Sequence, residues 1–176
     1  MISRYAALAL FTANAEERTK TYDIHVTHGR SNMVTIVYDS MYEDYMSVNY
    51  YGISGTLCLQ MNDLPRKLRN SSHPNIKVYL EMTKVEDIEL SGASSITFEG
   101  EFSTSELDLD MSGASHLHSL KIKGTSLSAD CSGASKAKVY ASKHLKYDVS
   151  RTCKMTYYGD AELENISEDN NIVRGR

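Results

Sequence analysis

The sequence predicts an all-β protein made of stacked β-solenoid coils, with rungs of about 20 residues. Three observations predict this fold class: an exact tetrapeptide repeat, alternating apolar residues around each copy, and few helix signals. Ser-Gly-Ala-Ser begins at Ser91, Ser112 and Ser132, and a degenerate copy, Ser-Arg-Thr-Cys, begins at Ser150. Such near-constant spacing favours one structural unit per repeat.

Apolar residues occupy alternate positions on both sides of the tetrapeptide. Leu107, Leu109 and Met111 precede the second copy, and Ile96 and Phe98 follow the first. Alternation with period 2 is typical of a strand with one buried face. Each unit is therefore predicted to be a strand, a tight corner, a second strand and a loop.

The tetrapeptide itself is predicted to form the corner. Glycine adopts positive φ at little cost, alanine suits a narrow inward position, and serine hydroxyls bond to nearby backbone groups. Equivalent serines are then expected to stack at about 4.8 Å, the spacing between strands. The predicted corner residues are Gly92, Gly113 and Gly133 with Ala93, Ala114 and Ala134.

The competing architecture is a meander or sandwich of β-hairpins. Two-residue hairpin turns favour Asn-Gly or Asp-Gly, and neither dipeptide occurs in the chain. The solenoid is therefore favoured.

We predict one solenoid domain over residues 16–166. Residues 16–82 are expected to form irregular rungs and a cap, residues 83–160 the regular repeats, and residues 161–166 a second cap. The basic, proline-containing segment 64–74 is predicted to be a loop, residues 41–46 a weak helix, and residues 167–176 a polar tail.

The first 15 residues allow two interpretations. Arg4, a short apolar stretch and Ala13-Asn14-Ala15 resemble a minimal secretory signal. The same residues also suit a first strand or a short helix.

Composition excludes some classes of protein. The net charge is −4, which argues against broad nucleic-acid binding, and no apolar run is long enough to cross a bilayer. The three cysteines, Cys58, Cys131 and Cys153, allow one disulfide at most. Their apolar neighbours predict small core fillers, and no cofactor or metal is expected.

Two pairs of histidines are candidates for a metal site or a catalytic site. His116 and His118 share a strand face and follow Asp108 and Asp110, a metal-binding combination that a solvated polar face explains better. His25 and His28 near Asp23 lack a nucleophile motif, so no catalytic site is predicted there.

The best candidate for a binding surface is a group of tyrosines, because tyrosine combines apolar area with a hydroxyl group. Packing within a cap is the alternative. The group consists of Tyr38, Tyr42, Tyr45, Tyr50 and Tyr51. Arg66, Lys67 and Arg69 form a second, weaker candidate for contact with an anionic glycan or lipid headgroup.

The repeats resemble the head GIN domain family of "putative auto-transporter adhesins", which is common in Bacteroidetes. The segments that carry the resemblance are LSGASSITFEG, MSGASHLHSLKIKG and CSGASKAKVYAS, preceded by GTLCLQMNDLPRKLR and IKVYLEM. The resemblance covers most of residues 20–160. The chain departs from the family in its short export signal and in Arg151-Thr152-Cys153, where a glycine-containing corner is usual.

The resemblance implies a single-stranded, right-handed β-helix exported to the cell envelope, in the periplasm or on the cell surface. We expect a non-catalytic structural or adhesive module that binds a glycan or protein partner. Self-association through the solenoid ends is a further hypothesis. The alternative is a β-helix enzyme acting on polysaccharide. Its paired carboxylates would come from Asp108, Asp110, Asp130 and Asp148.

Overall fold

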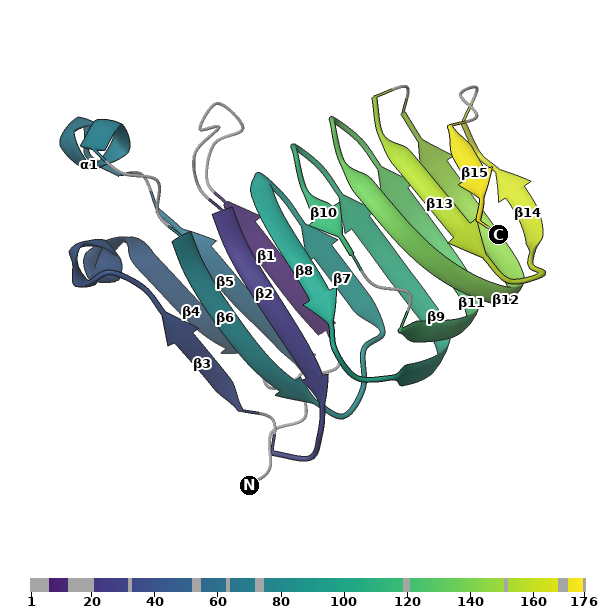
Figure 1. The fold of residues 1–176 in the computed structure, drawn as a ribbon, viewed down its shortest axis with the longest axis horizontal. Helices are drawn as coiled ribbons and strands as arrows, with labels where there is room; N and C mark the ends of the chain where they lie inside the picture. The colour runs from purple at the N-terminus through teal and green to yellow at the C-terminus, as the bar shows by residue number, and fades with distance from the viewer. Residues whose placement is uncertain are drawn as a thin grey trace.

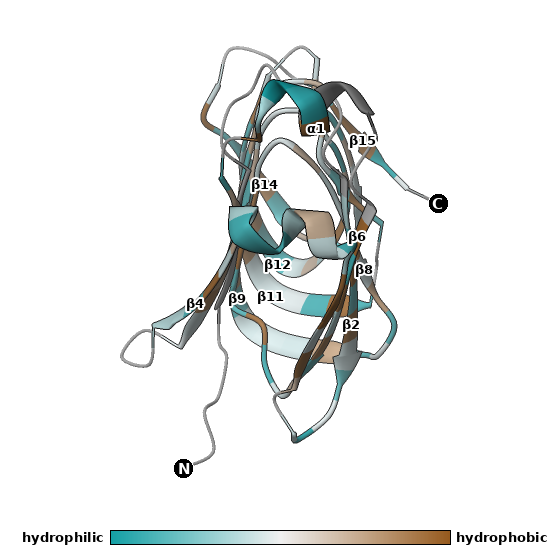
Figure 2. Ribbon diagram, turned by 90° about the vertical axis from the view of Figure 1, so that its left-hand side faces the viewer, coloured by the Kyte–Doolittle hydropathy of each residue, from teal (hydrophilic) through white to brown (hydrophobic). Residues whose placement is uncertain are grey.

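The chain folds into a β-solenoid whose strands stack along one axis in two facing sheets (Figure 1). The computed structural model describes residues 7–12, 21–31, 33–51, 55–62, 64–71, 75–118, 121–150, 152–167 and 171–175. The view along the stack shows the two sheets enclosing a narrow interior (Figure 2). The predicted fold class is confirmed.

Each rung contributes one strand to each sheet. The A sheet contains, in spatial order, β4 (Met46–Tyr51), β5 (Thr56–Met61), β1 (Ala7–Thr12), β7 (Asp87–Leu90), β9 (Phe102–Met111), β11 (Ile122–Cys131), the second half of β12 (Lys136–Val149) and β14 (Glu162–Asn165). The B sheet contains β3 (Val34–Val37), β6 (Asn75–Met82), β2 (Thr21–His28), β8 (Ala93–Phe98), β10 (His116–Leu117), the first half of β12, β13 (Lys154–Tyr158) and β15 (Ile172–Arg174).

The parallel strands keep one register from rung to rung. Leu107, Leu127 and Leu145 pair in succession and are buried, with exposed fractions of 3% or less. Because side chains alternate along a strand, every second residue joins such an inward column. The columns form one hydrophobic core that runs the length of the stack.

The corner glycines stack backbone on backbone. Gly92, Gly113 and Gly133 have φ values of 70°, 73° and 66°. The Ala114 N–H donates to the Gly92 carbonyl and the Ala134 N–H donates to the Gly113 carbonyl, both at 2.7 Å. A Cβ added at Gly113 would lie 2.5 Å from the Gly92 oxygen. Both the positive φ and the close approach therefore require glycine at this corner.

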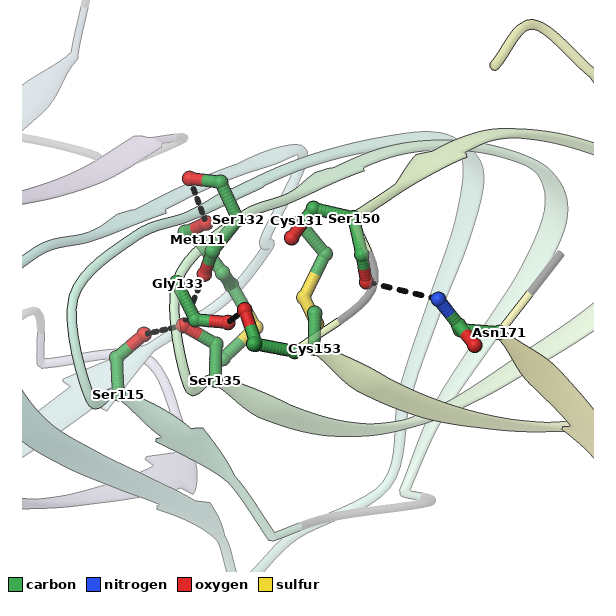
Figure 3. The surroundings of a disulfide bond; sticks show 10 residues. Met111, Ser115, Cys131, Ser132, Gly133, Ser135, Ser150, Cys153 and Asn171 are labelled. Atoms are coloured by element: carbon green, nitrogen blue, oxygen red, sulfur yellow. Dashed lines mark hydrogen bonds between the residues drawn. A yellow bond between two sulfur atoms is a disulfide. The ribbon is translucent and has the colours of Figure 1, made fainter. Parts of the chain in front are cut away.

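The inward residue of the corner is the second serine, and the prediction that alanine points inward is wrong. Ser115 and Ser135 are fully buried, whereas Ala114 and Ala134 are exposed. The two serine hydroxyls lie 3.2 Å apart, and the Ser135 hydroxyl also lies 2.8 Å from the Ser132 carbonyl. These contacts satisfy the polar atoms that the corner buries (Figure 3).

Side-chain contacts add to the fourth, degenerate corner. The Thr152 hydroxyl donates to the Gly133 carbonyl, the equivalent of the glycine carbonyls that accept the alanine N–H groups in the earlier corners. Cys153 follows in the next inward position and forms a disulfide with Cys131 across one rung (Figure 3). Both cysteines are buried in the core, as predicted, and they form the one disulfide that three cysteines allow, while Cys58 is a buried free thiol. Arg151 lies outside the described residues.

The order of the rungs in space differs from their order in sequence. The rung made of β1 and β2 lies between the β5–β6 rung and the β7–β8 rung (Figure 1). Ala7–Thr12 is therefore an interior strand of the A sheet, as the first-strand interpretation of this segment expects.

Antiparallel strands close the end of the stack beside β5 and β6. β3 pairs with β6 and β4 pairs with β5, and the 3-10 helix η1 (Ser40–Tyr45) connects them. η1 covers most of the predicted weak helix at residues 41–46.

Two predicted coil segments contain regular structure. The segment 64–74, predicted to be a loop, includes the short helix α1 (Arg66–Ser71), and residues 72–74 lie outside the described part. The segment 167–176, predicted to be a polar tail, includes β15, which pairs with β13.

The stacked corner predicts a large effect of Gly113→Ala. A side chain at positive φ and against the Gly92 carbonyl costs about 2 kcal/mol or more, so the free energy of unfolding should fall by that amount in urea denaturation. The neighbouring Ala114→Ser, on the exposed side of the same corner, should change it by less than about 0.5 kcal/mol. Equal losses in both variants would contradict the corner geometry.

The interior position of β1 predicts that the chain needs its first strand. Deletion of residues 1–15 leaves β5 and β7 without their shared neighbour. At about 1 kcal/mol per lost hydrogen bond, the stability should fall by about 5 kcal/mol. Thermal unfolding followed by circular dichroism measures this. An unchanged melting temperature would show that β1 is dispensable, as a removable signal segment would be.

Candidate functional site

The outer face of the A sheet carries a row of carboxylates. Glu89, Asp110, Asp130 and Asp148 occupy equivalent positions on successive strands, and Asp87 and Asp108 form a second, shorter row beside them. Burial, followed by the negative charges of Asp110 and Asp148, raises the pKa of Asp130. Burial and neighbouring carboxylates likewise raise the pKa values of Asp87 and Glu89.

These carboxylates do not form the opposed pair that glycoside hydrolysis uses. A glycosidase places two carboxyl groups on either side of the scissile bond. Here Asp108, Asp110, Asp130 and Asp148 all project from one face of one sheet, side by side. The row is a charged surface.

The structure separates the histidines and aspartates of the hypothetical metal site. His116 and His118 lie on the B-sheet side of the solenoid, whereas Asp108 and Asp110 lie on β9 in the A sheet. The two imidazole rings stack on each other, with centroids 5.7 Å apart. Among the described residues, no group of three or more His, Cys, Asp or Glu side chains is arranged to hold a metal ion.

The B sheet gathers a polar and aromatic group around His25. The Nδ1 atom of His25 lies 2.9 Å from the Glu99 carboxylate, and its Nε2 atom lies 3.3 Å from the Asp23 carboxylate. The imidazole stacks on the Tyr79 ring at a centroid distance of 5.3 Å. His25, Tyr79 and Glu99 line a shallow depression of about 140 Å³ together with Met33 and Thr35. We call the set His25, Asp23, Glu99 and Tyr79 the His25 site.

Two carboxylates favour the charged form of His25 and raise its pKa. The hydrogen bond to Glu99 contributes most to the raised pKa of His25, burial opposes it, and Asp23 adds to it. Both ring nitrogens act as donors in the imidazolium. The Ser95 hydroxyl lies 3.4 Å from the Asp23 carboxylate and 3.4 Å from the Tyr22 carbonyl oxygen.

Sequence reasoning identified His25 and Asp23 but missed Tyr79 and Glu99. Tyr79 faces His25 because β6 pairs with β2, and Glu99 follows β8 on the other side of β2. These pairings join segments more than 50 residues apart. Only the alternation within each strand was available as a signal, and it does not specify the neighbouring strand.

The five predicted tyrosines do not share one surface. Tyr42 is buried, and Tyr38 and Tyr45 are partly buried against the core near the β3–β4 end. Tyr50 and Tyr51 lie on β4 with exposed fractions of 37% and 57%. Arg66 and Lys67 are exposed on α1, and the side chain of Arg69 lies outside the described part.

A family model described as "Putative auto-transporter adhesin, head GIN domain" matches residues 17–138. The chain belongs to this family. The head GIN assignment agrees with the resemblance that the repeated corners carry. No curated protein matches the chain.

Several solved structures are similar to this head GIN protein at low sequence identity. An adhesin-like protein from Bacteroides fragilis has a TM-score of 0.49 and 12% identity, covering 90% of this chain and 91% of its own. A protein described as lipid binding, from Parabacteroides distasonis, has a TM-score of 0.46 and 12% identity, and the match covers 99% of this chain and 91% of its own. An adhesin-like protein from Parabacteroides merdae has a TM-score of 0.45 and 8% identity, and the match covers 98% of this chain and 90% of its own.

None of the helices in the described part of the head GIN chain has the length and apolar composition of a membrane span.

The His25 site predicts a specific pKa change. Glu99→Gln removes the strongest cause of the raised pKa, so the pKa of His25 should fall toward its ordinary value of about 6.5. An NMR titration of the His25 ring protons measures it. Because the folded-state pKa is raised, the stabilisation from this imidazolium is present below the unfolded-state pKa and is lost as pH rises through the folded-state pKa.

The matched control is Glu101→Gln, since Glu101 contacts Lys123 instead. It should leave the His25 titration unchanged. An identical His25 pKa in wild type and Glu99→Gln would contradict the site geometry.

The carboxylate row predicts that Asp130→Asn stabilises the protein near neutral pH. The folded-state pKa of Asp130 is raised, so its ionised form disfavours folding as pH rises through that pKa. Urea denaturation at pH 7 should therefore show a higher midpoint for the variant. The difference should shrink at low pH, where Asp130 is protonated. A variant less stable than wild type at pH 7 would contradict the repulsion.

Proposed function

We propose that this head GIN protein is a non-catalytic module of the cell envelope, in the periplasm or on the cell surface. It holds a glycan or protein partner on the outer face of its B sheet. The observation that carries the proposal is the His25 site. There an aromatic ring lies beside an imidazole and two carboxylates on the outer face of the B sheet.

The chemistry of the site suits recognition. The Tyr79 ring is 42% exposed and offers an apolar surface for a sugar ring or an apolar side chain. Asp23 and Glu99 offer acceptors for hydroxyl groups at the edge of that surface. The shallow form of the depression suits contact with part of a larger molecule, since small-molecule sites typically enclose several hundred Å³.

The Cys131–Cys153 disulfide supports a location outside the cytosol. Disulfides persist in oxidising compartments such as the bacterial periplasm and the cell surface, and are rare where thiols are kept reduced. The bond ties two successive corners of the core together, so it belongs to the folded structure itself.

A glycan array and affinity capture with envelope fractions test the proposed function. Tyr79→Ala should weaken binding by roughly tenfold, about the worth of one well-packed aromatic contact. Tyr51→Ala is the matched control, because Tyr51 is a similarly exposed tyrosine on the opposite sheet. Loss of binding in Tyr51→Ala with full binding in Tyr79→Ala would overturn the proposal and assign binding to Tyr51 on the opposite sheet.

Alkylation of the native protein in intact cells, followed by mass spectrometry, tests its location. Cys131 and Cys153 should resist alkylation until a reductant is added. Recovery of both as free, alkylated thiols after unfolding without reductant would contradict the envelope location.

Self-association through an end of the stack is a second candidate function. The last strands, β14 and β15, are edges in the described structure and expose Leu163 and Val173 at 41% and 64%. Exposed edge strands readily pair with another chain. Sedimentation velocity should show concentration-dependent oligomers that Val173→Lys removes, and a monomer at all concentrations would exclude this candidate.

A further inference from the structure

Three lysines share the outer face of the B sheet toward its C-terminal end. Lys136 on β12 pairs with Lys154 on β13, and Lys138 lies two residues along β12 on the same face. All three are exposed. The stacked register therefore places the backbones of Lys136 and Lys154 about 4.8 Å apart, which is the spacing between strands. We call these residues the lysine face.

No carboxylate of the described residues lies within salt-bridge distance of the lysine face. Three other exposed lysines, Lys84, Lys123 and Lys146, each pair with a glutamate. Like charges on neighbouring strands repel one another, and no ion pair with a described carboxylate offsets that repulsion. An anionic partner would.

The positive charge of the lysine face also acts on the neighbouring His116. His116 pairs with Lys136 and continues the column by one rung. Burial, then the charges of Lys136 and His118, lower the pKa of His116. The cationic character of this face thus comes from the lysines.

Two tyrosines border the lysine face. Tyr140 and Tyr158 are paired across β12 and β13, two and four residues beyond Lys138 and Lys154, and both are partly exposed. The Tyr140 ring lies beside Gly159, where an added Cβ would be 3.4 Å from its Cζ atom. The Tyr158 ring lies over Gly175, where an added Cβ would overlap it. Glycine under each ring lets it rest close to the backbone.

We propose that the lysine face with Tyr140 and Tyr158 binds an acidic polysaccharide, lying across the C-terminal rungs of the B sheet. This deepens the proposed function, on which it rests, by naming the class of glycan. The lysines pair with the acidic groups and the tyrosines stack on sugar rings.

Other partners fit this face less well. The centre of a protein interface is typically apolar and poor in charged residues, whereas three exposed lysines lie at the centre of this face. A linear polyanion needs only a row of cations on an open surface.

Binding to polygalacturonate, with neutral dextran as the reference, tests the proposal by biolayer interferometry at low ionic strength. Lys136→Gln/Lys138→Gln/Lys154→Gln should weaken polygalacturonate binding roughly tenfold, the sum of three exposed ion pairs. The control, Lys84→Gln/Lys123→Gln/Lys146→Gln, changes net charge equally and should keep binding within about twofold. Circular dichroism confirms that both triple variants fold.

The outcomes separate the inference from the proposed function. Equal losses in both triple variants would mean attraction to net charge alone and would overturn the lysine face. Binding of neutral glycans or envelope proteins without polygalacturonate binding would overturn the inference and leave the proposed function standing. Unchanged binding in Tyr140→Ala/Tyr158→Ala, together with equally tight binding of single-stranded DNA, would show that the face binds polyanions in general. That result would overturn the assignment of an acidic polysaccharide as the ligand.

Discussion

The stacking of one corner directly on the next is the constraint on which this structure depends. Gly113 has room for no side chain because the Gly92 carbonyl oxygen occupies the space that a Cβ would need. The hydrogen bond from the Ala114 N–H to that carbonyl fixes the distance between the two corners. A strand that slips by one residue exchanges its buried and exposed faces. Each stacked corner therefore prevents a slip in the two strands that meet there, and the register beside the corners of the rungs from β7 to β13 follows.

The same register organises the surface. Inside, it aligns leucines and serines into buried columns; outside, it aligns carboxylates on the A sheet and lysines on the B sheet. A functional surface of this protein therefore belongs to neighbouring rungs and not to any one segment. The His25 site illustrates this, because its four residues come from β2, β6 and the end of β8.

The sequence predicted the regular half of the fold well, because three exact tetrapeptides and period-2 alternation specify corners and strands directly. It misplaced Ala114 and Ser115 within the corner, since both are small and either fits a narrow interior. The interleaved β1–β2 rung was not predictable, because parallel pairing leaves no turn motif to mark a neighbour. For the same reason Tyr79 and Glu99 could not be joined to His25, nor Cys131 to Cys153, from spacing alone.

Scalar couplings across hydrogen bonds, measured by NMR on the 15N,13C-labelled protein, test the stacked corners most directly. The account predicts cross-peaks from the Ala114 amide nitrogen to the Gly92 carbonyl carbon and from the Ala134 amide nitrogen to the Gly113 carbonyl carbon. Couplings from these amides to carbonyls within their own rung, or rapid exchange of both amides with solvent, would contradict it.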